Sequence, residues 1–276
     1  MKRIVTVQDL SCLGKCSLTV ALPVLSAMGV ETAVLPTAVL SAHTKFQNVT
    51  FHDLTDQIQP ISAHWQQEGV TFDGIYTGYL GSPEQAELVC AFVDAFHGEN
   101  TKVIVDPVMG DNGRLYTGIS REMCEKMKLL CQKADIILPN ITEACYLTGM
   151  EYREDYDSAY IDRLLQALSA RCKGVCILTG VSFQPGQIGV MGRAGAMEAF
   201  HCTEKLPVSY HGTGDIFAAA FSGAVLRGRS WQQAIQIAAD YTGQCIRLTM
   251  EDTREDKYGV HFERALPKLI RVMEEQ

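Results

Sequence analysis

The chain has 276 residues, of which 47% are apolar and 20% are charged, and its formal net charge is −8. This composition supports a large hydrophobic core and excludes an intrinsically disordered chain. The acidic balance argues against a general electrostatic surface for nucleic acid or anionic membranes, and no apolar stretch reaches the roughly 18 residues of a membrane span.

Short apolar runs alternate with longer helical patterns through the first hundred residues. Strands are predicted at residues 4–7, 32–35 and 74–76, and helices at residues 18–28, 54–65 and 83–96. The helix at residues 83–96 has the clearest start, because Ser82 can cap it and Pro83 suits its first position. Residues 36–52 lack a regular pattern and are rich in polar side chains, so we expect an irregular lid or substrate loop.

The remaining chain continues this alternation and then becomes helical. Further elements are predicted as strands at residues 103–105, 136–138 and 175–178, a hairpin of residues 188–191 and 196–200 around a turn at 192–195, and helices at residues 215–226, 231–249 and 262–274. The alternation is typical of an α/β fold with a mostly parallel central sheet and helices on both faces. Since no linker, repeat or low-complexity segment interrupts it, we expect one domain over residues 1–276.

Polar groups stand at the ends of five predicted strands. They are Asp9, Tyr79, Asp106, Asn140 and Thr179. In an open parallel sheet, ligands bind beyond the carboxyl ends of the strands. Each residue alone is a weak signal, because strand ends are polar by default, but five at one edge predict a binding site. For Tyr79 the alternative is a half-buried packing aromatic.

The most informative stretch is Gly212-Thr213-Gly214-Asp215, which leads directly into an apolar helical pattern. Two glycines allow a tight turn with bare N–H groups, and the positive end of the helix dipole favours a phosphate there. A carboxylate at that place can accept a proton from an attacking alcohol. The stretch therefore predicts phosphoryl transfer to a hydroxyl group, with a simple turn and helix cap as the alternative.

Acidic side chains near the same edge are candidates for holding Mg²⁺, directly or through water. They are Asp106, Asp111 and Glu143. Magnesium keeps most of its waters and needs only one or two carboxylates in addition to phosphates. Asp111 also fits a turn at residues 110–113, and Glu143 also fits the first turn of a short helix at residues 142–147.

Other sequence patterns exclude several classes. Gly14-Lys15-Cys16-Ser17 is similar to the end of a Walker A loop, but Asp9 stands where that motif needs glycine, and Cys16 where it needs Ser or Thr. The Rossmann glycine pattern is missing after the first strand, so neither a P-loop ATPase nor a dinucleotide oxidoreductase is expected. The ten cysteines include no C-x-x-C pair and no histidine cluster completes a zinc site. With no signal segment at the start, we expect reduced thiols and a cytoplasmic protein.

Taken together, five blocks resemble the ribokinase-like superfamily and, within it, the pyridoxal/pyridoxamine kinases. The blocks are residues 37–46, 77–82, 106–110, 139–143 and 212–215, spread over nearly the whole chain. The resemblance implies a ribokinase-like fold, usually in a homodimer. It also implies phosphorylation of the hydroxymethyl group of a vitamin B6 ring with ATP and Mg²⁺, and it leaves open a monovalent cation.

The resemblance further implies roles for single residues. Asp215 matches the base that deprotonates the acceptor hydroxyl, and the amides of Gly212, Thr213 and Gly214 match the groups that receive the phosphoryl group. Positions along the nucleotide phosphates and metal are matched by Asp106, Asn140, Glu143 and Thr179, with Asp111 a weaker member. Thr44 and Tyr79 match positions that line the pyridine ring pocket.

Two departures leave the ring substrate open. Asp9 stands where pyridoxal kinases commonly carry a serine, and its carboxylate could accept from a ring hydroxyl or a protonated amine, which favours pyridoxine or pyridoxamine. His211 before the glycine turn is closer to the hydroxymethylpyrimidine kinases of thiamine synthesis. Such a hydroxymethylpyrimidine (phosphate) kinase and a non-catalytic protein that binds B6 or nucleotide are the alternatives. Sugar kinases are disfavoured, because the short N-terminal region leaves little sequence for an inserted lid.

Overall fold

The computed structural model describes residues 1–252 and 257–275. Its strands are β1 (Arg3–Ser11), β2 (Glu31–Leu40), β3 (Phe51–Asp53), β4 (Gly74–Thr77), β5 (Lys102–Val105), β6 (Gly110–Asp111), β7 (Arg114–Leu115), β8 (Ile136–Ile137), β9 (Val175–Val181), β10 (Gln187–Ala194) and β11 (Met197–Glu204). Its helices are α1 (Leu18–Ala27), α2 (Thr55–Gln67), α3 (Pro83–Phe96), α4 (Arg121–Lys133), α5 (Ile141–Thr148), α6 (Ser158–Ser169), α7 (Thr213–Leu226), α8 (Trp231–Met250), the 3₁₀ turn η1 (Phe262–Arg264) and α9 (Leu266–Glu274).

The centre of the molecule is a nine-stranded sheet with the order β11-β10-β9-β8-β5-β4-β1-β2-β3. The six strands from β9 to β2 in this order are parallel to their neighbours in that group. The outer strands β3, β10 and β11 are antiparallel. The predicted mostly parallel sheet is therefore confirmed. The expected single domain over residues 1–276 agrees with this one large sheet and stays a prediction.

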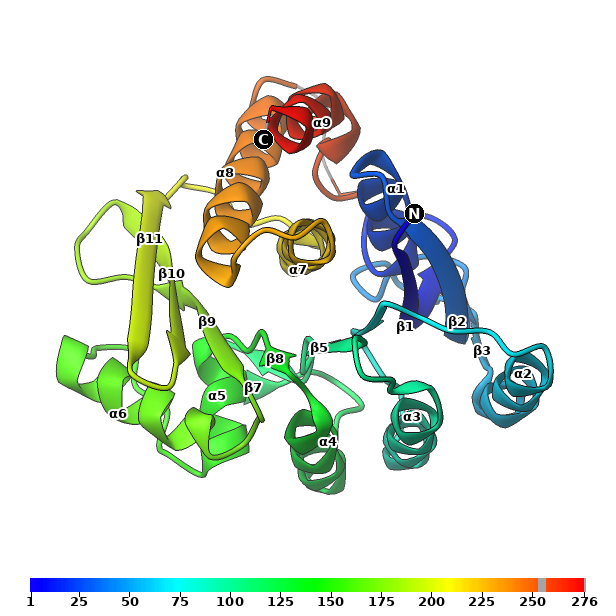
Figure 1. Ribbon diagram of the computed structural model, residues 1–276. Coiled ribbons are helices and arrows are strands. Elements are labelled where there is room, and N and C mark those ends of the chain that lie inside the picture. The colour runs from blue at the N-terminus through cyan, green and yellow to red at the C-terminus, as the bar shows by residue number, and fades with distance from the viewer. Residues whose placement is uncertain (253–256, 276) are drawn as a thin grey trace.

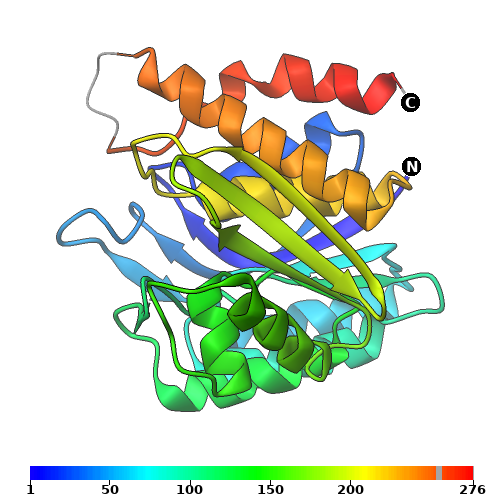
Figure 2. The same ribbon diagram turned by 90° about the vertical axis from the view of Figure 1, so that its left-hand side faces the viewer.

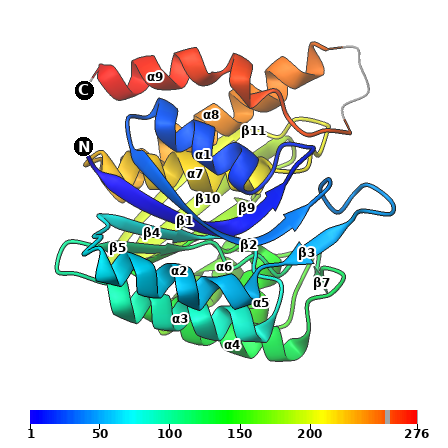
Figure 3. The ribbon, with the colours of Figure 1, turned by 90° about the vertical axis from the view of Figure 1, so that its right-hand side faces the viewer.

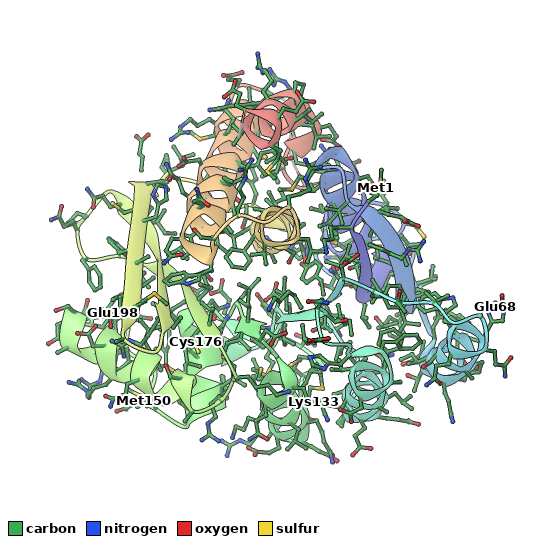
Figure 4. All side chains as sticks on the ribbon, viewed as in Figure 1. Met1, Glu68, Lys133, Met150, Cys176 and Glu198 are labelled. Atoms are coloured by element: carbon green, nitrogen blue, oxygen red, sulfur yellow. The ribbon has the colours of Figure 1, made fainter. Side chains whose placement is uncertain are left out.

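Helices cover both faces of the sheet, as predicted. Figures 1 and 3 show α1, α7, α8 and α9 over one face and α2 to α6 over the other. Alternate side chains of each strand enter the two layers, so that Ile4 packs with α1 and α7 while Val5 packs on the opposite side. In Figure 4 side chains fill both layers, with Cys176 inside and Glu68 and Glu198 at the periphery. Within the described residues, no helix is both long and apolar enough to cross a membrane.

Two predicted boundaries near the start of the chain were wrong. β1 continues to Ser11, so Asp9 lies inside the strand, and β2 continues to Leu40, so only residues 41–50 form an irregular loop before β3. Pro36 hides this extension in the sequence, because proline lacks the N–H of a regular ladder. It lies opposite Gln8, next to a register shift at which Asp9 faces two residues of β2.

The C-terminal half differs from the prediction in three places. β9 continues to Val181, so Thr179 lies within the strand. The hairpin of β10 and β11, seen at the front of Figure 2, has a shorter turn, because residues 192–194 belong to β10. The predicted helix at residues 262–274 is split into η1 and α9. Pro267 explains the split, since it cannot donate the hydrogen bond of a continuous helix.

The order of the strands determines where ligands can bind. After β1 the chain moves to β2 on one side and later returns to β4 on the other, so β1 and β4 form the topological switch point. Open α/β sheets bind ligands beyond the carboxyl ends of the strands at such a point. Figure 3 shows residues 41–50, between β2 and β3, projecting past this edge of the sheet.

A substitution at Phe92 tests the packing of the core between α3 and the sheet. It is 1% exposed, and its ring centroid lies 4.5 Å from that of Phe96 and 6.2 Å from that of Trp65. We expect Phe92→Ala to lower the free energy of unfolding by about 3–5 kcal/mol, measured by denaturant unfolding. Leu129→Ala is the control, because Leu129 is 49% exposed on α4 and its truncation should cost about 0.5 kcal/mol or less. Equal losses in the two variants would contradict this packing.

Candidate active site

Helix α7 begins at the glycine turn without a side-chain cap. Gly212 adopts a left-handed conformation with φ of 83°, and the first helical hydrogen bond runs from the Ile216 N–H to the Gly212 carbonyl at 3.0 Å. Among the described residues we find no acceptor for the N–H groups of residues 213–215. These donors and the positive end of the helix dipole make the start of α7 suited to bind an anion.

Side chains close the N-termini of five other helices. The N-termini of α3, α4, α5, α6 and α8 are capped by Ser82, Ser120, Asn140, Asp157 and Ser230 respectively. The capping oxygen in each accepts a backbone N–H that an anion would otherwise use. Helix α7 differs from these five helices, because no side chain among the described residues accepts its first N–H groups.

The two glycines of the turn have different surroundings. A Cβ at Gly212 would lie 2.0 Å from the carbonyl oxygen of Lys15, so this glycine is needed for packing. A Cβ at Gly214 would meet no atom within 4 Å. The backbone at Gly214 therefore faces open space, where a ligand can approach its N–H.

Asp215 lies in the first turn of α7 and is enclosed by protein on most sides, although its side chain keeps some solvent exposure. Burial, with a smaller contribution from the Asp9 carboxylate, raises its pKa to about 7, although a hydrogen bond from the Ser17 backbone opposes the shift. A carboxyl group with a pKa near neutrality can accept a proton readily at physiological pH.

Asp9 lies close to both α7 and Tyr79. Its side chain is 4% exposed, and the Ser11 hydroxyl donates to its Oδ2 at 3.1 Å. Burial raises the pKa of Asp9, opposed by hydrogen bonds from Ser17 and Ser11. Burial also raises the pKa of the half-buried Tyr79, and the nearby Asp9 carboxylate adds to that shift. Asp9 is therefore near both Asp215 and Tyr79.

Thr44 belongs to the exposed loop of residues 41–50. We find no side-chain hydrogen bond of Thr44 within the part of the chain that the structure describes. Its neighbour His43 is 1% exposed and packs against His211, with ring centroids 4.6 Å apart and the ring planes tilted by 43°. Thr44 is therefore attached to the start of α7 through His43.

Asn140 and Thr179 lie side by side on neighbouring strand ends. They form an isolated parallel β-bridge, and the Thr179 N–H donates to the Pro139 carbonyl at 2.9 Å. Asn140 also forms a capping box with Glu143, in which each side chain accepts the other's backbone N–H at 2.9 Å. Three of the four predicted nucleotide positions, Asn140, Glu143 and Thr179, are thus connected by hydrogen bonds and strand pairing.

Glu143 already uses both of its carboxylate oxygens. Oε1 accepts the Met109 N–H at 3.0 Å and Oε2 accepts the Asn140 N–H. Burial raises its pKa to about 8, although these backbone donors oppose the shift. This geometry favours a positioning role for Glu143, with contact to a metal ion through water.

Asp106 has the environment of an incomplete cation site. Its side chain is 8% exposed, and we find no hydrogen-bond donor to its carboxylate among the described residues. Burial raises its pKa well above the ordinary value, and the neighbouring Glu143 and Asp215 carboxylates raise it further. Carboxylates crowded in this way fit a bound divalent cation.

The described residues include no group of three or more His, Cys, Asp or Glu side chains arranged to hold a metal by themselves. Magnesium would therefore need waters and phosphates as further ligands. Asp111 is exposed in the hairpin turn between β6 and β7, where its carboxylate accepts the Asn112 N–H at 2.8 Å. This is the turn that was the alternative interpretation of the sequence.

Sequence reasoning missed the segment before α1. Its similarity to a Walker A loop was correctly rejected, yet Cys16 and Ser17 lie against Gly212 and Asp215. Ser17 has a φ of 47°, which is uncommon for a residue other than glycine. The available signal was its place in the first turn after β1, at the switch point. His43 was also given no role, although Gly14 can approach its ring only because a Cβ is missing there.

Comparison with known proteins identifies the family of the chain. The sequence profile of the family described as phosphomethylpyrimidine kinase matches residues 20–260. A solved structure from Bacteroides thetaiotaomicron, named as a candidate phosphomethylpyrimidine kinase and crystallised with pyridoxal, is 39% identical with a TM-score of 0.93, covering 97% of this chain and 95% of that one. Pyridoxal kinase from Lactobacillus plantarum is 32% identical with a TM-score of 0.93, covering 100% and 99%. A pyridoxine/pyridoxal/pyridoxamine kinase from Bordetella avium is 27% identical over 257 residues, covering 89% of this chain and 85% of that protein.

The two glycines provide a matched test of the turn. Gly212→Ala should lower the free energy of unfolding by roughly 2–4 kcal/mol, because the new methyl group overlaps the Lys15 carbonyl in a left-handed conformation. Gly214→Ala should change it by about 0.5 kcal/mol or less, since that site is open. Denaturant unfolding of both variants measures the difference. A Gly212→Ala protein as stable as the parent would refute the close packing.

Proposed function

This chain belongs to the phosphomethylpyrimidine kinase family, and we propose that it transfers the γ-phosphoryl group of ATP to the hydroxymethyl group of a vitamin B6 compound. It is a kinase, and its relatives include pyridoxal and pyridoxine kinases. The observation that carries the proposal is the uncapped N-terminus of α7, with Asp215 in its first turn, Asp9 near Asp215, and Tyr79 near Asp9.

The chemical step requires a base and an anion site at one place. Asp215 takes the proton of the acceptor hydroxyl, and the oxygen then bonds to the γ-phosphorus of ATP while the bond to the β–γ bridging oxygen breaks and ADP leaves. The amides of residues 213–215 donate to the oxygens of the transferring group, and Gly212 gives the turn the shape that presents them. A single well-placed donor of this kind contributes roughly 3–4 kcal/mol to transition-state stabilisation.

The nucleotide and its metal would lie along the neighbouring strand ends. Asp106 would hold Mg²⁺ directly or through water, and Asn140 and Thr179 would line the phosphates. Bound Mg²⁺ neutralises phosphate charge. Glu143 holds Asn140 and Met109 in place, and Asp111 remains a weaker candidate for the metal. A monovalent cation is a further candidate, without a residue assigned to it.

The ring pocket would contain Asp9, Thr44 and Tyr79. The pyridoxal-bound relative and the pyridoxal kinase at 32% identity both support a B6 ring over a thiamine-precursor pyrimidine. A panel of pyridoxal, pyridoxine, pyridoxamine and hydroxymethylpyrimidine, with ADP release as the readout, tests this choice. If the protein prefers hydroxymethylpyrimidine, that compound replaces vitamin B6 as the assigned substrate. If no acceptor leads to release of ADP, the result favours a non-catalytic binding protein.

The proposed biological setting follows the family resemblance. We propose a homodimer in the cytoplasm whose partners are the small-molecule acceptor and ATP, without nucleic acid or membrane. The net charge of −8 supports the absence of a general nucleic-acid surface. Sedimentation of the purified protein would test the dimer.

Asp215→Asn tests the base. We expect turnover to fall by about 10²–10⁴-fold while ATP binding stays close to the parent value, because the amide cannot accept the proton but keeps the shape of the side chain. In the parent, kcat/KM should rise with pH through about 7 and then level, since the carboxyl group must be ionised. Near-normal turnover in the variant would remove Asp215 from the reaction.

Asp9→Ser tests ring selection. Loss of the buried carboxylate should lower kcat/KM for pyridoxamine relative to pyridoxal by about tenfold, because a charge-assisted hydrogen bond to the ring substituent is lost. Steady-state kinetics with both vitamers give the ratio. Ser11→Ala serves as the control, since it removes only a partner of Asp9. An unchanged ratio in Asp9→Ser would exclude Asp9 from the ring pocket.

A further inference from the structure

A cavity lies next to the glycine turn. Its volume is about 290 Å³, and it is lined by Lys45, Phe46, Ser209, Tyr210, His211 and Lys257. Three segments that are distant in sequence meet there: the loop of residues 41–50, the residues before α7, and the chain after α8. None of the side chains assigned above to the acceptor ring, the nucleotide or the metal lines this cavity.

Two lysines give the described lining of the cavity a positive charge. Within the described residues, 1–252 and 257–275, no Asp or Glu lines the cavity and neither the Lys45 nor the Lys257 ammonium forms an ion pair. The Lys257 ammonium instead lies 5.8 Å from the centre of the Phe46 ring and 5.6 Å from that of Tyr258. Cation–π contacts of this kind hold an ammonium in place and leave its donors available.

The walls of the cavity are fixed by a buried histidine. The Nε2 atom of His43 lies 2.9 Å from the Lys257 carbonyl oxygen. Its ring packs at a tilt against Phe46 and His211, with centroid distances of 4.7 Å and 4.6 Å. This arrangement joins the three segments before any ligand is present. Burial, His43 and Lys45 together lower the pKa of His211 to about 4, so its imidazole is neutral at physiological pH and its ring nitrogens remain available for hydrogen bonds.

We propose that this cavity, named here the lysine pocket, binds a phosphate monoester or inorganic phosphate at a site separate from the nucleotide phosphates. Lysine ammonium groups bind phosphate as point charges, and the Ser209 hydroxyl adds a donor on the same wall. The volume accommodates a phosphate with a small ring. Since the pocket adjoins α7, a phosphate held there lies beside the acceptor side of the site and competes with entry of the acceptor.

Direct binding tests the proposal without any dependence on turnover. Pyridoxine 5′-phosphate and inorganic phosphate are titrated calorimetrically at low ionic strength, with a non-hydrolysable ATP analogue and Mg²⁺ present to fill the amides of α7. Lys45→Met and Lys257→Met should each weaken binding about five- to tenfold, and Lys257→Arg should largely restore it, because one charged donor is lost and then replaced. Tighter binding of the ring phosphate identifies the ester as the ligand, and equal binding identifies free phosphate.

Lys15→Met is the matched control. Lys15 also lies beside the glycine turn, but its ammonium pairs with Glu263 at 3.0 Å and lies outside the pocket. The Lys15→Met substitution should leave the affinity for both phosphate ligands within about twofold of the parent value. Unchanged affinity in both pocket variants, with thermal unfolding showing that they are folded, would overturn the proposal. An equal loss in Lys15→Met would also overturn it, because the effect would then come from the general potential around α7.

Discussion

The contact between two helix starts determines the geometry of the whole site. Gly212, at the start of α7, packs on the carbonyl of Lys15, and Ser17, at the start of α1, provides a backbone hydrogen bond to Asp215. Neither helix has a side-chain cap. Two positive dipole ends therefore lie side by side at the switch point between β1 and β4, and they favour negative charge there.

Burial of the acidic residues at this edge lowers the stability of the fold, but the same burial suits them to phosphoryl transfer. Burial raises the pKa of Asp9, Asp106 and Asp215, so each ionised carboxylate lacks part of the stabilisation it would have in water. A protein without phosphates or metal ions to bind would gain stability by replacing them. Their retention together with free amides on α7 is the arrangement that phosphoryl transfer requires, because charge develops there during the reaction.

His43 anchors the loop of residues 41–50 to the rest of the structure. Its ring is buried against Phe46 and His211 and reaches the backbone of Lys257, so the loop, the start of α7 and the chain after α8 are held together. A substitution at this position would disturb both the ring pocket near Thr44 and the lysine pocket. The loop is irregular in backbone yet anchored by one of the most buried polar side chains in the described chain.

The sequence by itself determined the alternation of the main strands and helices, the mostly parallel sheet, and the positions of Asp106, Asn140 and Asp215 after strands or at a helix start, but not the short strands β3, β6 and β7. These depend on local signals, namely apolar periodicity, glycine turns and strand ends. Only the tertiary structure decided that both oxygens of Glu143 bind backbone N–H groups and that β2 continues past Pro36. It alone brought His43 to Lys257, 214 residues away. Such contacts depend on how distant segments pack, which no local pattern encodes.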